Sequence, residues 1–340
     1  MVTKMVDNIW DELLPFIHRD NFIFLTDRNV YNLYKYEINN LINGRENIYI
    51  MEPGEKSKGL QELTNVYKTL IRNSIDRQGM ILSLGGGVVG DLAGFAAATY
   101  KRGINYIQIP TTLLAQVDSS IGGKTGIDFS GEKNIIGAFH FPSISLIYTS
   151  FIDTLPKKEI TSGLGEIIKY GLIEDYDFFI YTIKNINKIY NRDKRILSSI
   201  INKSIEIKTS LYENDRFDQG IRQNLNFGHT VGHGIEALFN FEKYNHGEAV
   251  ILGMIYETSI AYEKGLISKE YYEEVVSTLK PLVELKKFNE EQIELIIKHM
   301  KNDKKNKASN IRFILPTDKG IVNIFDDIDE MTIIKALTNI

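Results

Sequence analysis

Apolar residues in the first half of the chain fall into short runs that alternate with longer stretches of helical spacing. NFIFLTD (21–27), NIYIME (47–52) and MILSLGG (80–86) are predicted strands. Residues 30–43 and 59–75 lie between them and predict a polar helix and an amphipathic helix. Strands that alternate with helices are typical of βαβ units, so we expect a mostly parallel sheet that binds a nucleotide at the carboxyl ends of its strands.

The second half has a different pattern. From about residue 161 to 305 the apolar residues recur at helical spacing throughout, and a single strand is expected at 311–316. We therefore place a domain boundary near residue 152. The fold class expected is an N-terminal α/β domain over 1–152 followed by a mainly α-helical domain over 153–340.

Composition excludes several classes of protein. The 340 residues are 43% hydrophobic and 25% charged, and 40 basic against 44 acidic residues give a net charge of −4, which argues against nucleic-acid or membrane-surface partners. The chain has no cysteine, so a metal would have to be held by histidine and carboxylate. No stretch approaches the roughly 20 apolar residues of a membrane span or resembles a signal peptide, so we expect a cytoplasmic protein.

Histidines gather in one segment. Three of the six lie in residues 224–248, namely His229, His233 and His246. His229 and His233 are four residues apart, which on a helix places both rings on one face, as in helical zinc sites. The alternative is that one of them caps or packs and binds no metal. A catalytic zinc usually has three protein ligands, and Glu166 in SGLGEIIKYGLI is the upstream candidate.

Glycines follow the third predicted strand. Gly85, Gly86, Gly87 and Gly90 open a helix of small residues, and such a turn lets unpaired helical N–H groups approach a phosphate. The usual dinucleotide fingerprint follows the first strand and has an acidic residue about 20 positions later, where this chain has Pro110. The sequence predicts a phosphate-binding turn, and a tight turn with a closely packed helix is the alternative. Asp91 would face a sugar or the nicotinamide amide.

Charged residues also occur in apolar or glycine-rich surroundings between residues 106 and 148. Asp118 ends the run IPTTLLAQVD, while Lys124, Lys133 and Asn134 lie in what we expect to be flexible loops. This density suggests anion binding and acid/base chemistry, and a salt bridge under a loop is the alternative for any one of them.

Spacing brings further polar residues together in the helical half. Glu166 and Lys169 are three apart and share a helix face, so they would project together unless they form a surface ion pair. Arg222 and Asn226 precede His229 and His233 at spacings of four or seven among these residues, which predicts one helical face that aims the Arg, the Asn and both His into one cleft.

Several long motifs occur in order: LGGGVVGDLAGFAAATYKRGI, IPTTLLAQVDSSIGGKTGID, GEKNIIGAFHFP, GEIIKYG, NFGHTVGHGIE and NHGEAV. In these motifs the chain resembles the 3-dehydroquinate synthase family over about residues 50–316. The family belongs with the glycerol dehydrogenases and iron-type alcohol dehydrogenases. Gly165 and Gly234 stand where the family commonly has Ala, and Gly weakens a helix by about 0.5–1 kcal/mol relative to Ala.

The resemblance implies a Rossmann-like NAD-binding domain and a helical domain that holds Zn²⁺ or Co²⁺ and the substrate. It implies that the metal ligands are Glu166, His229 and His246, with His233 on the phosphate side rather than on the metal. The residues implied to bind NAD are Asp27, Glu55, Lys58, Gly86, Gly87, Val88, Asp91, Thr111, Thr112, Lys133, Phe151, Thr154, Leu155 and Glu159.

The resemblance also implies how a phosphorylated sugar acid would bind. Its carboxylate would meet Lys208 and Arg222, and its hydroxyls would meet the metal, Asp118, Lys169 and Asn226. The residues implied for the phosphate are Lys124, Asn134, His233, Lys304 and, across the interface of a homodimer, Arg102. The implied reaction is transient oxidation by NAD, elimination of phosphate, re-reduction and aldol closure, in which the substrate phosphate itself takes the proton.

Three other functions compete with this one. A metal-dependent polyol dehydrogenase would need the same glycine turn and metal ligands but not the five cations Lys124, Lys169, Lys208, Arg222 and Lys304. A sister cyclase such as 2-deoxy-scyllo-inosose synthase would use a hexose phosphate without a carboxylate, against which Arg222 and Lys208 argue. A non-catalytic nucleotide-binding module would leave the histidines and Glu166 unexplained.

Overall fold

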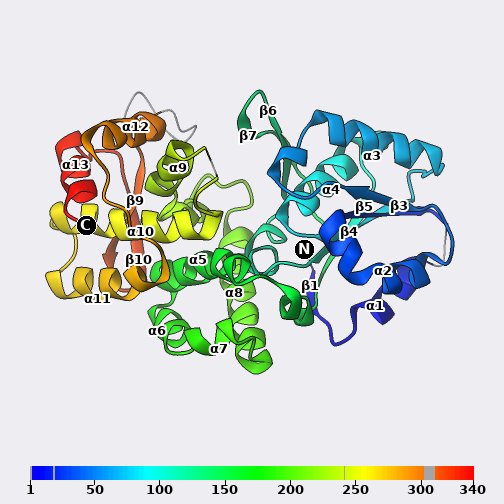
Figure 1. Cartoon of the computed structure of the whole chain (residues 1–340), viewed down its shortest axis with the longest axis horizontal. Coiled ribbons are helices and arrows are strands. Elements are labelled where there is room, and N and C mark those ends of the chain that lie inside the picture. Colours follow the sequence, from blue (N-terminus) through cyan, green and yellow to red (C-terminus); the bar gives the residue numbers. More distant parts are fainter. Residues whose placement is uncertain (1, 18–19, 241, 302–310) are drawn as a thin grey trace. The chain divides into compact units, whose positions relative to one another are not determined.

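The structure is a computed structural model that describes residues 2–17, 20–240, 242–301 and 311–340. It divides into two compact units, Met1–Leu155 and Pro156–Ile340. Figure 1 traces the helices and strands of both. Among the described residues, none of the helices combines the length and the apolarity that crossing a bilayer requires.

The first unit is built on a parallel sheet of six strands in the order β1-β8-β5-β4-β2-β3. The strands are β1 (Thr3–Met5), β2 (Phe22–Asp27), β3 (Ile48–Met51), β4 (Met80–Gly85), β5 (Asn105–Pro110) and β8 (Ile144–Ile147). The three strands predicted from apolar runs are confirmed as β2, β3 and β4. β1, β5 and β8 are additions, and β1 has only three residues, too few to show a period.

Helices cover both faces of this sheet, as Figure 1 shows for α1 and α2 on one side and α3 on the other. Alternate residues of β2 explain the arrangement: Phe22 and Phe24 pack with α1 and α2, while Ile23 and Leu25 pack with α3 and α4. Strands buried on both faces read as continuous apolar runs, which is how they appear in the sequence. The helices are α1 (Ile9–Ile17), α2 (Arg28–Ile42), α3 (Leu60–Arg72) and α4 (Gly87–Thr99).

The prediction of flexible loops around Lys124, Lys133 and Asn134 is wrong. They form an antiparallel hairpin of β6 (Lys124–Phe129) and β7 (Glu132–Phe139), in which Gly126 and Gly137 face each other. A Cβ on either glycine would meet the backbone of the other strand, so these glycines allow close strand pairing rather than flexibility.

The second unit is mainly helical, as predicted. Its helices are α5 (Lys157–Glu174), α6 (Tyr176–Lys184), α7 (Ile186–Tyr190), α8 (Lys194–Asn214), α9 (His229–Leu238), α10 (His246–Glu263), α11 (Lys269–Leu279), α12 (Glu290–Lys301) and α13 (Glu330–Thr338). The expected strand is confirmed as β9 (Phe313–Asp318), which pairs antiparallel with β10 (Ile321–Phe325). One core cluster joins α9, α10, α12 and α13 to β9, so α9 and α10 lie on a rigid base.

Candidate active site

The carboxyl ends of three neighbouring strands carry polar residues at one edge of the sheet in the first unit. Asp27 ends β2, Gly86 follows β4, and Thr111 follows β5, with the Thr111 N–H donating to the Gly85 carbonyl at 3.0 Å. Because β2, β4 and β5 are adjacent and parallel, these residues lie along one edge. The Asp27 side chain caps α2 through the Val30 N–H at 3.0 Å, and burial raises the pKa of this carboxyl although the cap opposes the shift.

The glycine turn serves both close packing and an open helix end. A Cβ at Gly90 would overlap the Gln108 side chain and one at Gly94 the Thr125 side chain, so α4 packs closely on the sheet. At Gly86 an added Cβ would meet only the Thr112 side chain, with the methyl at 3.1 Å and the hydroxyl oxygen at 3.7 Å. Gly86 is the N-cap of α4 and has no side chain with which to cap it. The first N–H groups of α4 are therefore available to a ligand anion.

Lys58 is the centre of a buried polar network. Its side chain is 4% exposed, and its Nζ lies 2.6 Å from Asp91 Oδ2, 2.6 Å from Asn134 Oδ1 and 3.8 Å from Glu55 Oε1. Burial alone would lower the pKa of Lys58, but the carboxylates of Asp91 and Glu55 outweigh it and raise that pKa. The structure thus joins predicted cofactor residues to Asn134, which the resemblance implies for phosphate.

The remaining predicted residues of the first unit are more dispersed. Phe151 is 1% exposed and packs edge-on against Tyr34, whose hydroxyl lies 3.2 Å from Thr154 Oγ1. Thr112 accepts the Ala115 N–H at 3.0 Å, just before the π-helical turn Ala115–Ser119 that contains Asp118. Four others lie on elements already described: Val88 on α4, Lys124 on β6, Lys133 on β7 and Leu155 at the end of the unit.

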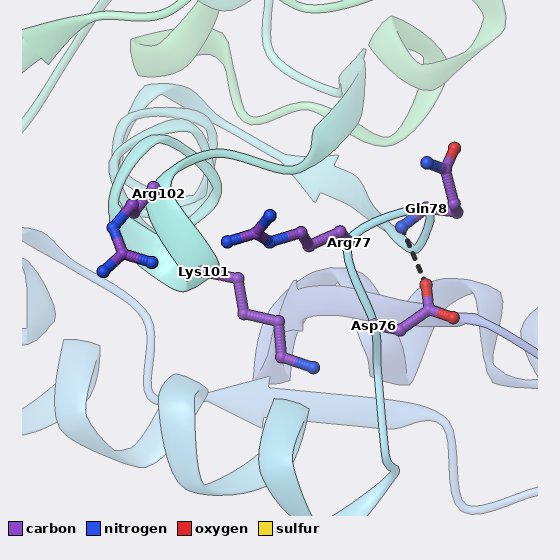
Figure 2. Close-up of a pocket in the computed structure, with 5 residues that line it drawn as sticks. All are labelled: Asp76, Arg77, Gln78, Lys101 and Arg102. Atoms are coloured by element: carbon purple, nitrogen blue, oxygen red, sulfur yellow. Dashed lines mark hydrogen bonds between the residues drawn. The ribbon is translucent and has the colours of Figure 1, made fainter.

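Arg102 lies at the other end of α4, next to an open pocket of about 530 Å³ lined by Asp76, Arg77, Gln78, Lys101 and Arg102. Figure 2 shows the Arg77 side chain extending toward Lys101 and Arg102. The pocket lies where β4 and β5 begin, at the opposite edge of the sheet from the glycine turn. Lys101 donates to the Ile75 carbonyl at 2.7 Å.

Two histidines and one glutamate converge in the second unit. Glu166 lies on α5, His229 opens α9 and His246 opens α10, and one ligand atom from each lies within 4.8 Å of the others. Glu166 Oε1 is 3.2 Å from His246 Nε2 and 3.6 Å from His229 Nε2, while Oε2 accepts the Lys169 ammonium. Glu166 and Lys169 are 1% and 2% exposed, which excludes a surface ion pair.

Glycines bring these helices together. A Cβ at Gly165 would lie 2.7 Å from the Gly247 Cα, and one at Gly253 would overlap the Gly228 carbonyl oxygen. Gly228 itself has φ 78°, a left-handed conformation that glycine adopts without strain. Gly165 therefore permits close contact between α5 and α10.

His246 lies between two carboxylates. Its Nδ1 is 3.9 Å from Glu236 Oε1, on the side opposite Glu166. Burial alone would lower the pKa of His246, but Glu166 and Glu236 outweigh it and raise the pKa to about 10. Sequence reasoning missed Glu236, although its position three residues after His233 on α9 was a visible signal. His233, Glu236 and His246 form a second group whose ligand atoms lie within 4.8 Å.

The prediction that Arg222 and Asn226 share one helical face with the two histidines His229 and His233 is wrong. Residues Ile221–Asn226 form a separate 3-10 helix, η5, and the left-handed conformation of Gly228 separates it from α9. Arg222 is buried over the Tyr212 ring of α8, and Lys208 lies one turn earlier on that helix, also buried. Arg222 therefore lies against α8, the helix that carries Lys208, and helical spacing did not predict this contact.

Two predicted residues remain. Glu159 lies in the first turn of α5, where burial raises its pKa. Lys304 lies outside the described residues.

Comparisons with known proteins agree over most of the chain. Residues 48–162 match the family 3-dehydroquinate synthase N-terminal, and residues 163–306 match 3-dehydroquinate synthase C-terminal. The chain is 43% identical over 305 residues to a 3-dehydroquinate synthase from Alkaliphilus metalliredigens, covering 89% of this chain and 85% of that protein. It is 42% identical over 334 residues to one from Dictyoglomus thermophilum, covering 96% and 93%.

Solved structures show the same fold at lower identity. The 2-epi-5-epi-valiolone synthase of Streptomyces hygroscopicus subsp. jinggangensis 5008, with NAD⁺ and Zn²⁺ bound, superimposes with a TM-score of 0.88 at 23% identity, covering 98% of this chain and 95% of that one. A 2-deoxy-scyllo-inosose synthase complexed with carbaglucose-6-phosphate, NAD⁺ and Co²⁺ gives 0.87 at 24% identity, covering 99% and 96%. A probable glycerol dehydrogenase from Sinorhizobium meliloti 1021 gives 0.67 at 14%, covering 99% and 95%.

Proposed function

The chain belongs to the 3-dehydroquinate synthase family, and we propose that it converts 3-deoxy-D-arabino-heptulosonate 7-phosphate to 3-dehydroquinate and inorganic phosphate. The observation that carries this proposal is the match of residues 48–162 and 163–306 to the two parts of that family, and the convergence of Glu166, His229 and His246 supports the metal it requires. A cytoplasmic location and a homodimer are parts of the same proposal.

The donor set fits a divalent metal. Two imidazole nitrogens and one carboxylate oxygen are a ligand set typical of catalytic zinc, and imidazole also suits cobalt and its neighbours. The second carboxylate oxygen of Glu166 is held by Lys169, which fixes the orientation of the first. Glu166, His229 and His246 would hold Zn²⁺ or Co²⁺, and the His233 side chain would lie on the phosphate side.

The first unit supports NAD binding along its carboxyl edge. The exposed N–H groups of α4 would receive the pyrophosphate, with Gly86 and Gly87 allowing its close approach. Asp27 at the end of β2 would meet a ribose, and Lys58 would hold Asp91 in place beside the cofactor. The remaining residues proposed for NAD are Glu55, Val88, Thr111, Thr112, Lys133, Phe151, Thr154, Leu155 and Glu159.

When bound, the metal would polarise a substrate hydroxyl as a Lewis acid, and NAD would accept and return the hydride. Arg222 and Lys208 would bind the substrate carboxylate, since both are buried cations beside α8. Lys169 Nζ would donate to a substrate hydroxyl while its ion pair holds the Glu166 side chain in place. The other residues proposed for hydroxyls and phosphate are Asp118, Lys124, Asn134, Asn226, His233 and Lys304.

Arg102 has a separate place in the proposal. It lies at the edge of the sheet opposite the glycine turn, which supports its action in the site of a partner subunit rather than in its own. A homodimer would then be required for full phosphate binding.

The test is release of phosphate from the heptulosonate phosphate with NAD far below the substrate concentration. We expect many turnovers per NAD, no net NADH, and loss of activity when the metal is chelated. Glucose 6-phosphate and glycerol serve as control substrates for the sister cyclase and the polyol dehydrogenase. Turnover that consumes NAD in proportion to product, or release of phosphate from glucose 6-phosphate alone, would contradict the proposal.

A further inference from the structure

Glu257 is a buried carboxylate on α10 that the proposed chemistry does not use. It is 0% exposed and lies about three turns along the helix from His246. Its Oε2 accepts the Gly228 N–H at 2.6 Å, and its Oε1 accepts the Val231 N–H at 3.0 Å. A carboxylate on one helix therefore binds two backbone amides at the start of another.

In many helices, the backbone N–H groups at these two positions donate to the side chains of a capping box. In a capping box, the N-cap side chain accepts the N–H of the third helical residue, and the side chain of that third residue accepts the N–H of the N-cap residue. In α9 the N-cap is Gly228 and the third residue is Val231, and neither side chain can accept a hydrogen bond. Glu257 supplies both acceptors from α10, and its negative charge at a helix N-terminus is stabilising.

Glycine at 228 is itself imposed by the packing. The residue has φ 78°, and an added Cβ would lie 2.7 Å from the Val250 carbonyl oxygen and 2.6 Å from the Met254 Cγ. A capping side chain at this position would therefore clash with α10. The close contact that brings His229 toward His246 removes the ordinary cap, and Glu257 replaces it.

The Phe227–Gly228 peptide connects this cap to His229. Its N–H donates to Glu257, and its carbonyl lies 3.2 Å from His229 Nδ1. A carbonyl only accepts hydrogen bonds, so Nδ1 carries the proton and Nε2 is left as the atom that faces Glu166. Glu257 thus fixes the peptide plane, and the peptide plane fixes the tautomer and direction of the His229 ring.

We infer that Glu257 is a positioning residue for the metal site: through the Phe227–Gly228 peptide it orients His229 for ligation. This inference rests on the proposed function, because it assumes that His229 binds the metal. Groups that orient a ligating histidine usually change metal affinity by about 10–100-fold when they are removed.

The experiment compares Co²⁺ binding by Glu257→Gln with the wild type and with the control Thr258→Val, using the full chain. Gln keeps the shape of the side chain but presents an N–H₂ group to one of the two amides. Thr258 is also 0% exposed, and its hydroxyl donates to the Met254 carbonyl of its own helix at 2.6 Å. Thr258→Val therefore removes one buried hydrogen bond of the same helix. Affinity is measured by competition with a chromophoric chelator, and coordination by the visible absorption of bound Co²⁺.

We expect Glu257→Gln to lose about 10–100-fold in Co²⁺ affinity and to change the Co²⁺ spectrum. Thr258→Val should remain within about twofold of the wild type, with the same spectrum, even if its thermal stability falls. Equal affinity and spectrum for Glu257→Gln and the wild type, or an equal loss in Thr258→Val, would overturn the inference.

A second variant applies if Glu257→Gln does not fold. Glu257→Asp keeps the charge but is one methylene shorter, so it cannot reach both amides. We expect an intermediate loss of affinity and faster hydrogen exchange in the segment 228–231, and wild-type behaviour in both would overturn the inference. Co²⁺ binding by the wild type and by His229→Ala separates the two hypotheses. If the wild type binds no Co²⁺, or if His229→Ala binds it as the wild type does, the proposed function is overturned together with the inference. If binding requires His229 but not Glu257, only the inference is overturned.

Discussion

The contact at Gly253 allows a quantitative test of how packing positions the histidines. A Cβ on Gly253 would overlap the Gly228 carbonyl oxygen, and would lie 2.7 Å from the Gly228 carbon and 2.8 Å from the Gly232 nitrogen. All three are backbone atoms, so no rotamer change can relieve the contact. α9 and α10 must move apart, and His229 and His246 lie at the start of these two helices.

The expected magnitude for Gly253→Ala follows from two opposing effects. Overpacking a core costs about 1–3 kcal/mol, and a backbone overlap belongs at the upper end of that range. Replacing Gly with Ala in a helix interior gains about 1 kcal/mol. The net loss is about 2 kcal/mol, which lowers the melting temperature of a unit of this size by about 4–8 °C.

Thermal unfolding of the metal-free variant, followed by circular dichroism, measures this loss, and zinc affinity measures its effect on the histidines. Ser259→Ala is the matched control, because it changes a buried small residue of the same helix. Helix propensity alone predicts that Gly253→Ala is more stable than the wild type. A raised melting temperature with unchanged zinc affinity would therefore refute the role of this contact.

Three further predictions concern pH, the second helix contact and the lysine network. The pKa of His246 is about 10 without metal, against 6.5 ordinarily, so zinc must displace a proton when it binds. The zinc affinity, measured by chelator competition, should therefore rise with pH up to about 10. A flat pH profile would argue against this. The same shift stabilises the metal-free fold fully below pH 6.5 and is lost as the pH rises through 10, so urea midpoints should fall over that interval. Gly165→Ala should lower the melting temperature despite better helix propensity, since its Cβ would lie 2.7 Å from the Gly247 Cα; a higher melting temperature would count against the contact. Lys58→Met should destabilise the first unit by about 3 kcal/mol in urea unfolding, because Asp91 loses the partner of a buried ion pair, and an unchanged midpoint would disprove that role.

The sequence predicted the elements whose signal is local. The strands β2 and β4 were visible because strands buried on both faces are continuously apolar, and the edge strand β3 was visible from its apolar run although it is only partly buried. The helices of the second unit were visible from their period. The hairpin β6–β7 was missed because its glycines resembled loop residues, whereas Gly126 and Gly137 serve close strand pairing.

The residues of the site could be predicted from the sequence motifs, but most of their contacts could not. Glu166 and His246 are 80 residues apart, so helical spacing could not predict their contact at 3.2 Å. Glu166 became a candidate because a catalytic zinc usually has three protein ligands, and the family resemblance implied the full ligand set. The break at Gly228 was hidden because the residues around it continue a helical pattern, while its cause lies in α10. Glu257 carried no signal, since a glutamate in an apolar helix shows its partners only after the helices pack.

Zinc stoichiometry in ligand variants tests the metal assignment most directly. Equilibrium dialysis of the wild type should give about one Zn²⁺ per chain, as expected for a single three-ligand site. His229→Ala should lose this ion, and His233→Ala should keep it, because His233 belongs only to the neighbouring group with Glu236. Zinc retained in His229→Ala but lost in His233→Ala would contradict the account.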